Sequence, residues 1–254
     1  MNPLLRFICA SCLLVSCSGK QSIKYLTDLE QENIKGRVAK LVTETYQLDS
    51  LGKLGKLESM TIEIFNELGY TTTDTARDFM EKKEVANFLT YNKNGSLSSL
   101  LTFENGKKQS KIVAEYENNK CTTMKIYDSS DKLESYYSNI SQTRQGLLSG
   151  VSSYGANGKL TMSYVNDYDS IYQTGATARD SAGMPTSVVK IQLTDKKYPA
   201  STLETSYFKD STVRKYLSYK YESWDTTDNW IQQTVFDDKG KAIKMVKRIF
   251  SYRP

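Results

Sequence analysis

Apolar and polar residues alternate along this chain in short runs, and a turn signal separates one run from the next. In segment 110–116, for example, Ile112, Ala114 and Tyr116 fall on one face of an extended strand. A period of two is typical of β-strands that turn one face toward water. We therefore expect strands rather than helices over most of the chain.

The turn signals recur at a nearly constant spacing. Aromatic residues that precede a polar turn lie at positions 91, 103, 116 and 127, so about 12 residues separate them. This spacing matches one strand plus one tight turn. Asn94-Gly95 and the Asp-x-x-Gly segment 237–240 supply the positive φ angles that such turns require. Connections this short allow only antiparallel neighbours.

The pattern predicts an all-β fold, an antiparallel meander of successive hairpins that forms one long curved sheet. Such a sheet closes toward a barrel or folds into two layers, and the pattern does not choose between them. Segment 21–32 has weak helical spacing and is interpreted as a short helix or a lead-in strand. Segment 74–86 is interpreted as a loop or helical turn, and segments 139–150 and 172–185 as longer loops or bulged hairpins.

The N-terminus has the layout of a secretory signal. Arg6 is followed by an apolar run over 7–14 and then by Leu14-Val15-Ser16-Cys17. The run is too short to span a membrane, which takes about 20 apolar residues. The segment resembles the bacterial lipobox, which implies that residues 1–16 are removed and that Cys17 is acylated.

This interpretation sets the domain boundaries and the location. Residues 1–16 are the signal peptide, 17–35 a tether and lead-in segment, and 36–254 a single β-repeat domain, because no linker rich in Pro, Gly or Ser interrupts it. Acidic residues after the lipidated cysteine resemble a surface-export signal in Bacteroidota, and Ser18-Gly19-Lys20 has none. We expect anchoring to the outer membrane through the N-terminal lipid, on the periplasmic face rather than the cell surface.

Several segments resemble the YD, or Rhs-type, repeat. Tyr127-Asp128 with Lys132-Leu133, and Tyr154 with Gly158-Lys159-Leu160, are the nearest copies. The tail over 219–252 resembles the closing segment of many Bacteroidota lipoproteins with degenerate repeats of this type. The resemblance extends loosely from residue 36 to the end, and most copies lack the Asp. It implies a β-hairpin fold and an envelope location, and it implies no activity.

A second pattern resembles the Bacteroidota O-glycosylation motif, in which Asp precedes Ser or Thr and then an apolar residue or Thr. The candidate acceptors are Ser50, Thr75, Ser170, Ser181, Ser211 and Thr226. Asp-Ser and Asp-Thr are also good turn formers, so both interpretations stay open.

The composition removes most catalytic chemistry. The 254 residues include no histidine, which excludes Ser-His-Asp and Cys-His catalysis and His-based metal sites. Cys9 and Cys12 lie in the removed segment, so Cys121 is the one thiol left beside the acylated Cys17. A single thiol forms no internal disulfide and no cysteine-based zinc site, and we expect Cys121 to be a small buried hydrophobic residue.

Binding chemistry is also restricted. No phosphate-binding glycine motif is present, and the net charge of +5 is spread along the chain without a basic block. We expect no enzyme, no cofactor, no metal and no nucleic-acid partner.

Tyrosine is the outlier of the composition, with 18 residues. A candidate aromatic face for sugars or peptides consists of Tyr216, Tyr219, Tyr221, Trp224 and Trp230. Aromatic pairs across strands are also ordinary sheet packing, and we weigh that interpretation more heavily.

The sequence favours a non-enzymatic envelope lipoprotein, a binding or scaffold module that presents a sheet face to an envelope protein or polymer such as a glycan. A carboxylate-dependent glycan-acting enzyme is one alternative, because two acids brought together by folding leave no trace in a sequence. A hydrophobic-ligand carrier and an immunity or accessory protein are further alternatives. The oligomeric state stays open.

Overall fold

The fold is known from a computed structural model that describes residues 25–118, 120–143 and 147–254. The signal segment 1–16 and Cys17 lie outside these residues. In the described part of the chain, one short helix, α2 (Asp28–Gln31), precedes the strands. The strands are β1 (Val38–Leu48), β2 (Leu54–Phe65), β3 (Thr71–Asp78), β4 (Lys83–Tyr91), β5 (Leu97–Glu104), β6 (Lys107–Glu117), β7 (Lys120–Asp128), β8 (Leu133–Gln142), β9 (Leu148–Gly155), β10 (Leu160–Asp169), β11 (Tyr172–Asp180), β12 (Pro185–Leu193), β13 (Pro199–Phe208), β14 (Ser211–Trp224), β15 (Trp230–Phe236) and β16 (Ala242–Tyr252).

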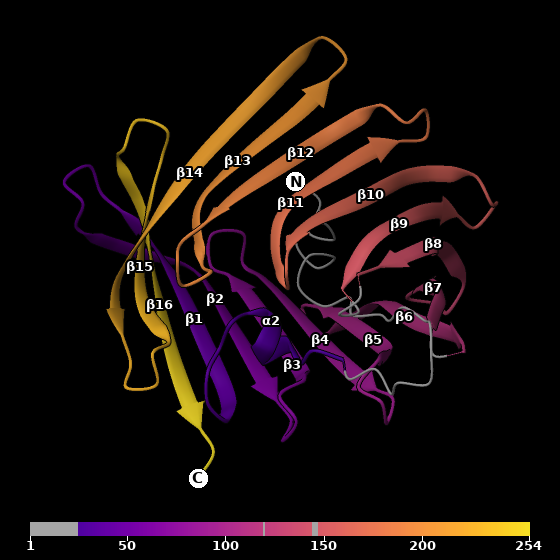
Figure 1. Cartoon of the computed structure of the whole chain (residues 1–254), viewed down its shortest axis with the longest axis horizontal. Helices are drawn as coiled ribbons and strands as arrows, with labels where there is room; N and C mark the ends of the chain where they lie inside the picture. Colours follow the sequence, from indigo (N-terminus) through magenta and orange to yellow (C-terminus); the bar gives the residue numbers. More distant parts are fainter. Residues whose placement is uncertain (1–24, 119, 144–146) are drawn as a thin grey trace.

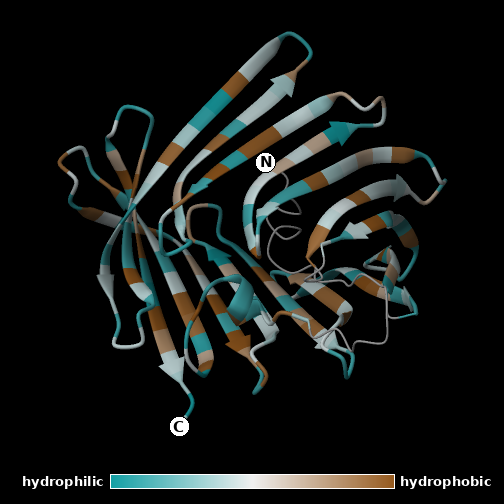
Figure 2. Ribbon diagram, viewed as in Figure 1, coloured by the Kyte–Doolittle hydropathy of each residue, from teal (hydrophilic) through white to brown (hydrophobic). Residues whose placement is uncertain are grey.

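The strands form a closed barrel (Figure 1). Each strand pairs antiparallel with the next, and β16 returns to pair with β1, from Val38 opposite Tyr252 to Gln47 opposite Lys244. The all-β antiparallel meander predicted from the sequence is confirmed, and of the architectures left open the chain adopts the barrel. Alternating apolar and polar residues are visible along the ribbons in Figure 2.

Segment 74–86, interpreted as a loop or helical turn, contains most of β3, a tight turn and the start of β4, so that interpretation was wrong. Asp74 in segment 74–86 and Asn87 just after it are polar residues on the inner face of the barrel, and this hides the apolar alternation. Segment 172–185 contains β11 and its turn, with a register shift between Ala178 and Arg179, as in a bulged hairpin. Segment 139–150 carries a register shift between Ser138 and Ser141, as in a bulged hairpin.

The repeated sequence motif is a turn with a fixed hydrogen-bond pattern. In the turn after β15, the Asp237 carboxylate accepts the backbone N–H groups of Lys239 and Lys241. Gly240 donates its N–H to the Asp237 carbonyl and has a φ of 73°. The same side-chain pattern recurs in turns that begin at Asp49, Asn66, Asp128, Asp180 and Asp225. The motif therefore encodes hairpin turns, and copies that lack Asp keep the backbone geometry.

A ring of this many strands encloses more space than its own inward side chains fill, because about eight strands already suffice for a filled interior. Residues 25–37, here called the strap, occupy part of that space at the end of the barrel where β1 begins. Strap residues Leu29 and Ile34 pack on Leu41 and Phe65 of the wall. None of the helices in the described residues has the length and hydrophobicity to cross a membrane.

The opposite side of the lumen is a hydrophobic cluster. Tyr25 of the strap packs there with Met124, Leu148 and Val151, and Cys121 is 3% exposed. The expectation that Cys121 is a buried hydrophobic residue is confirmed.

The short helix of the strap is defined by its caps. Thr27 and Glu30 form a capping box at its start, each side chain bonding the other's backbone N–H. At its end Asn33 has a φ of 55°, and Ile34 donates to the Leu29 carbonyl over 2.8 Å. This is a Schellman motif, and its usual apolar contact is made by Ile34 and Leu29. The two caps fix the backbone at both ends of α2, so the residues that follow the helix have defined positions.

A matched pair of glycine substitutions tests how closely the turns hold the strap. Gly95 and Gly106 both have positive φ, but a Cβ on Gly95 would overlap the hydroxyl of buried Tyr70, whereas nothing lies within 4 Å at Gly106. Tyr70 donates to the strap carbonyl of Tyr25. Gly106→Ala should cost about 1 kcal/mol of backbone strain, and Gly95→Ala about 1–3 kcal/mol more. Urea unfolding of the two variants measures the difference, and equal losses would contradict the packing described.

Candidate functional site

A pocket of about 410 Å³ lies between the strap and the inner wall of the barrel. Its aromatic lining consists of Tyr172, Tyr198, Tyr219, Tyr221 and Trp230. Its hydrogen-bonding groups include Gln31, Glu32 and Asn33 of the strap and Gln233 and Arg248 of the wall. We call it the strap pocket.

Strand pairing brings the wall residues to the same side of the sheet. Gln233 of β15 lies directly opposite Tyr221 of β14, and paired residues of antiparallel strands share a face. Tyr219, two residues before Tyr221, therefore faces the same way. Its hydroxyl is 3.0 Å from the hydroxyl of Thr202 on β13. Three neighbouring strands thus contribute to one wall.

The aromatic rings form a connected cluster. Tyr221 is 5.5 Å from Tyr198 and 5.5 Å from Trp230, measured between ring centroids. The Arg248 guanidinium lies 4.0 Å from the centre of the Trp230 ring. Burial raises the pKa values of Tyr198 and Tyr221, so both hydroxyls are protonated donors at neutral pH. The wall therefore offers flat apolar rings edged by hydrogen-bonding groups.

An ion pair connects the strap to the wall inside the pocket. Arg248 Nη2 lies 3.5 Å from Glu32 Oε2, at the long limit of a hydrogen bond, and the side chains are 15% and 29% exposed. Burial in the lumen raises the pKa of Glu32, and the Arg248 charge opposes that rise. The buried Nε of Arg248 has no hydrogen-bond partner among the described residues. The guanidinium thus contacts both the Glu32 carboxylate and the Trp230 ring.

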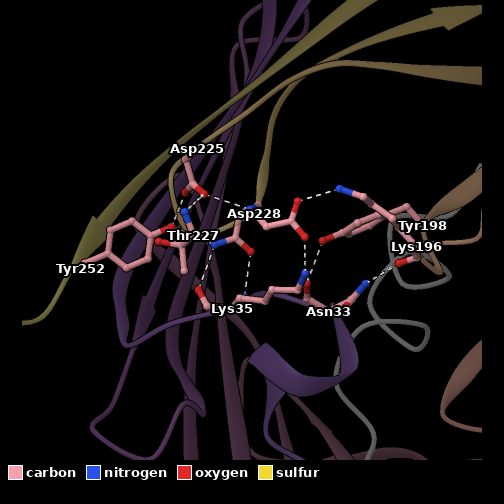
Figure 3. A network of polar contacts seen from close by, with 9 residues as sticks. Asn33, Lys35, Lys196, Tyr198, Asp225, Thr227, Asp228 and Tyr252 are labelled. Carbon is pink, nitrogen blue, oxygen red and sulfur yellow. Dashed lines mark hydrogen bonds and ion pairs between the residues drawn. The ribbon is translucent and has the colours of Figure 1, made fainter.

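A polar network fixes the end of the strap against two turns (Figure 3). Tyr198 donates to the Asn33 carbonyl over 3.0 Å, and the Asn33 amide donates to the Lys196 carbonyl over 2.8 Å. Lys35 forms an ion pair with Asp228 at 2.5 Å, and its backbone N–H donates to Asn229 Oδ1. Tyr198 thus contributes both to the pocket lining and to the attachment of the strap.

Further acids lie on the lumen side beyond the pocket. The pKa of Asp28, whose carboxylate accepts the Thr71 N–H and the Tyr91 hydroxyl, is raised by burial to about 6. Burial likewise raises the pKa of Asp74 to about 6. The pKa of Glu63 is raised well above 4.5 by burial and then by repulsion from Glu32. Within the described ranges, no three Asp, Glu or Cys side chains are arranged to hold a metal ion.

The structure separates the candidate aromatic face into three parts. Tyr219, Tyr221 and Trp230 line the strap pocket. Trp224 packs beside it on Tyr198 and Tyr221, with Lys196 over its ring. Tyr216, three positions before Tyr219, points to the other face of β14 and is 40% exposed.

The candidate glycosylation positions lie at the surface. Ser50, Ser170, Ser181, Ser211 and Thr226 are exposed and sit in or beside hairpin turns, while Thr75 is partly exposed within β3. These places suit both an acceptor role and a turn-forming role. The proposed lipid site, Cys17, lies outside the described residues.

The sequence analysis did not identify Arg248, Tyr198 or the strap as part of a site. The alternation of β16 does carry a signal for Arg248. The residue is two positions from Phe250, which packs against the core, so a cation shares the inward face. A charge at such a position needs a partner. Nothing comparable in the sequence relates the strap to a wall more than 200 residues away.

Comparisons with known proteins give no family. No family model and no curated protein matches the chain. Solved structures similar to it include a porin-like protein from Bacteroides uniformis, with 10% identity, 91% of this chain and 100% of the other covered, and a TM-score of 0.45. A porin-like protein from Bacteroides vulgatus has 10% identity, coverage of 87% and 100%, and a TM-score of 0.32. The Photorhabdus luminescens Tc holotoxin pore has 11% identity, coverage of 88% of this chain and 13% of that one, and a TM-score of 0.28. At these values the similarities carry no inference about function.

The buried acids predict that the protein is more stable at pH 5 than at pH 7.5. The pKa of Asp28 is about 6 when folded against 3.8 ordinarily, so its stabilising contribution is complete below pH 3.8 and is lost as the pH rises through 6. The whole rise corresponds to about 3 kcal/mol of unfolding free energy, of which about 1.4 kcal/mol is lost between pH 5 and pH 7.5. Urea unfolding at the two pH values measures the difference.

Asp28→Asn keeps an oxygen acceptor for Thr71 and should reduce that pH dependence. Asp238→Asn, at an exposed turn position, serves as the control and should leave it unchanged. A pH dependence that is identical in Asp28→Asn and the native chain would contradict the assignment.

Proposed function

We propose that this chain is a non-enzymatic binding module of the cell envelope, and that the strap pocket binds a short segment of an envelope glycan. The observation that carries the proposal is the combination of clustered aromatic rings with amide, guanidinium and carboxylate groups in one pocket of about 410 Å³. Pockets that bury small ligands have volumes of about 300–1,000 Å³.

The chemistry of the lining suits a saccharide. The C–H face of a sugar ring packs on flat aromatic surface, and Tyr219 and Tyr221 provide it beside Trp230, whose ring lies under the Arg248 guanidinium. Sugar hydroxyls both donate and accept hydrogen bonds. Gln233 supplies both functions, and the Glu32–Arg248 pair supplies an acceptor beside a donor.

The lining favours binding over hydrolysis. A glycosidase commonly uses two carboxyl groups about 5–9.5 Å apart around the scissile bond. Glu32 is the one carboxylate among the residues that line the strap pocket in the described chain. Glycan hydrolysis remains a second candidate because Glu63 and Asp74 are acids with raised pKa values on the same side of the sheet. Release of reducing ends, abolished in Glu63→Gln, would favour it.

A carrier of hydrophobic ligands is less well supported. Part of the lumen is occupied by the cluster around Tyr25, Met124 and Val151, and the strap pocket mixes rings with charged and amide groups. Such a lining leaves polar groups unpaired against an apolar ligand, which costs free energy.

We further propose that a lipid on Cys17 anchors the module to the outer membrane, on its periplasmic face. Only seven residues lie between Cys17 and Tyr25 of the strap, so the eight steps from one to the other reach at most about 28 Å. The strap end of the barrel would then lie near the membrane. Attachment by two or more acyl chains is firm, whereas one chain gives marginal binding.

Binding is tested with oligosaccharides released from the cell envelope, titrated into the purified protein by calorimetry. Tyr219→Ala removes a pocket ring and should weaken binding about fivefold, because each stacking contact contributes on the order of 1 kcal/mol. Tyr216→Ala is the matched control on the opposite face of the same strand and should bind like the native chain. Binding that both variants retain equally would count against the strap pocket.

Anchoring is tested by growth with labelled palmitate. The native chain should incorporate label and fractionate with the outer membrane, and Cys17→Ala should do neither, since the thiol that carries the lipid is gone. Cys121→Ala is the control for the other mature cysteine. Label retained in Cys17→Ala would place the modification elsewhere.

A further inference from the structure

The outer face of β16, β1, β2, β3 and β4 is unusually apolar. Leu41 and Asn87 point into the lumen, where they are buried, so the residues next to them in each strand point outward. One row of directly paired residues across this outer face is Ile249, Val42, Ile62, Thr75 and Ala86. A second row toward the strap end is Ser251, Lys40, Ile64, Thr73 and Phe88.

Large side chains on this face are open to solvent. Ile249 is 54% exposed, Phe88 46% and Ile64 36%. Across β8 to β11, one outward row is polar and consists of Ser138, Ser152, Ser163 and Arg179. Contiguous exposed apolar surface on a soluble domain commonly marks an interaction site.

A third row borders the apolar ones and carries charges in a special order. It reads Lys247, Glu44, Met60, Arg77 and Glu84 from β16 to β4. The signs are plus, minus, neutral, plus and minus, so the row is antisymmetric about Met60. Arg77 and Glu84 pair laterally at 2.5 Å and are 45% and 42% exposed, which leaves them accessible from outside.

We propose that this outer face binds a second copy of the chain, around a two-fold axis that runs parallel to β2. Rotation about that axis places Lys247 opposite the partner's Glu84 and Glu44 opposite the partner's Arg77, because it reverses the order of the strands. Met60, Ile62 and Ile64 then meet their own copies on the axis. Every charged residue of the third row faces an opposite charge, as an isologous interface requires.

The same rotation leaves both strap ends pointing in one direction. Two copies tethered to one membrane can therefore meet through this face. A two-fold axis across the strands would instead turn one strap end away from that membrane. The charge order of the third row selects the first arrangement.

The size of the face indicates a weak dimer. Neighbouring strands lie about 4.8 Å apart, and four residues along β2 span about 13 Å, so the three rows cover on the order of 500 Å² with their side chains. Stable interfaces bury about 800 Å² per partner. Tethering to a common membrane raises the effective concentration and offsets the small area.

Sedimentation velocity of the purified protein, up to about 100 µM, should show reversible dimerisation. One variant combines Lys247→Glu with Glu44→Lys, and another combines Arg77→Glu with Glu84→Lys. In each variant, neighbouring strands of one copy still carry opposite charges. Across the interface between two identical copies, however, like charges would meet, so each variant should dimerise about tenfold or more weakly. A one-to-one mixture of the two restores four attractive contacts and should dimerise like the native chain.

Further variants test the axis and the apolar rows. Ile62→Lys brings two cations together on the axis and should abolish the dimer, whereas Val165→Lys, at an outward position of β10 that is 46% exposed, should not affect it. Ile62→Cys should form a cross-link between copies.

A native chain that stays monomeric over the whole range, or paired variants that fail to restore each other on mixing, would overturn the proposal. So would a monomeric chain that binds phosphatidylcholine vesicles and loses this binding in Ile62→Lys, because the face would then contact lipid. The failure of glycan binding would leave these results unaffected.

Discussion

The rest of this structure depends on one constraint. The lumen of the barrel is too wide for the side chains of its own wall to fill, so other residues must fill it. Closure between β1 and β16 removes the exposed strand edges, which would otherwise promote aggregation. It also leaves an interior that needs additional material. The strap and the cluster around Tyr25 supply it, and the strap pocket is the part that they leave open.

The filling of the lumen explains its polar residues as well. The strap is held by backbone contacts and by Asp28, whose carboxylate accepts the N–H of Thr71, the first residue of β3. A carboxyl group placed there loses hydration, which raises its pKa. Glu32 is also buried in the lumen, which raises its pKa, and the positive charge of Arg248 opposes that rise. Asp28 and Glu32 therefore belong to the attachment of the strap, and the raised pKa of Asp28 makes stability vary with pH.

The sequence was sufficient for the strands and their order because that information is local. A turn such as 237–241 is determined by one Asp that accepts two N–H groups and one Gly with positive φ. Short turns of this kind force each strand beside the next one. Closure was not predictable, because the pairing of Glu44 with Lys247 depends on curvature summed over all the hairpins. The loop assigned to 74–86 was wrong because Asp74 faces a partly polar lumen and so breaks the apolar pattern.

The pocket was predictable only in part. Aromatic character alone identified three residues that do line the pocket, Tyr219, Tyr221 and Trp230. The same criterion wrongly included Tyr216, because a single sequence does not show which residues of a strand face the lumen and which face outward. Arg248 and Glu32 are 216 residues apart and meet through the strap.

The position of the strap also decides where mechanical load enters the molecule. The chain before Tyr25 leads directly into the lumen plug, so tension from the N-terminal side acts first on the contacts of the strap, including the Asn33, Lys35 and Asp28 bonds. The β1–β16 seam, which is joined by an antiparallel ladder from Val38 to Gln47 with a register shift near Val38, is loaded only after the strap has yielded. Tension on the N-terminal segment would thus displace the strap from the lumen before it separated β1 from β16.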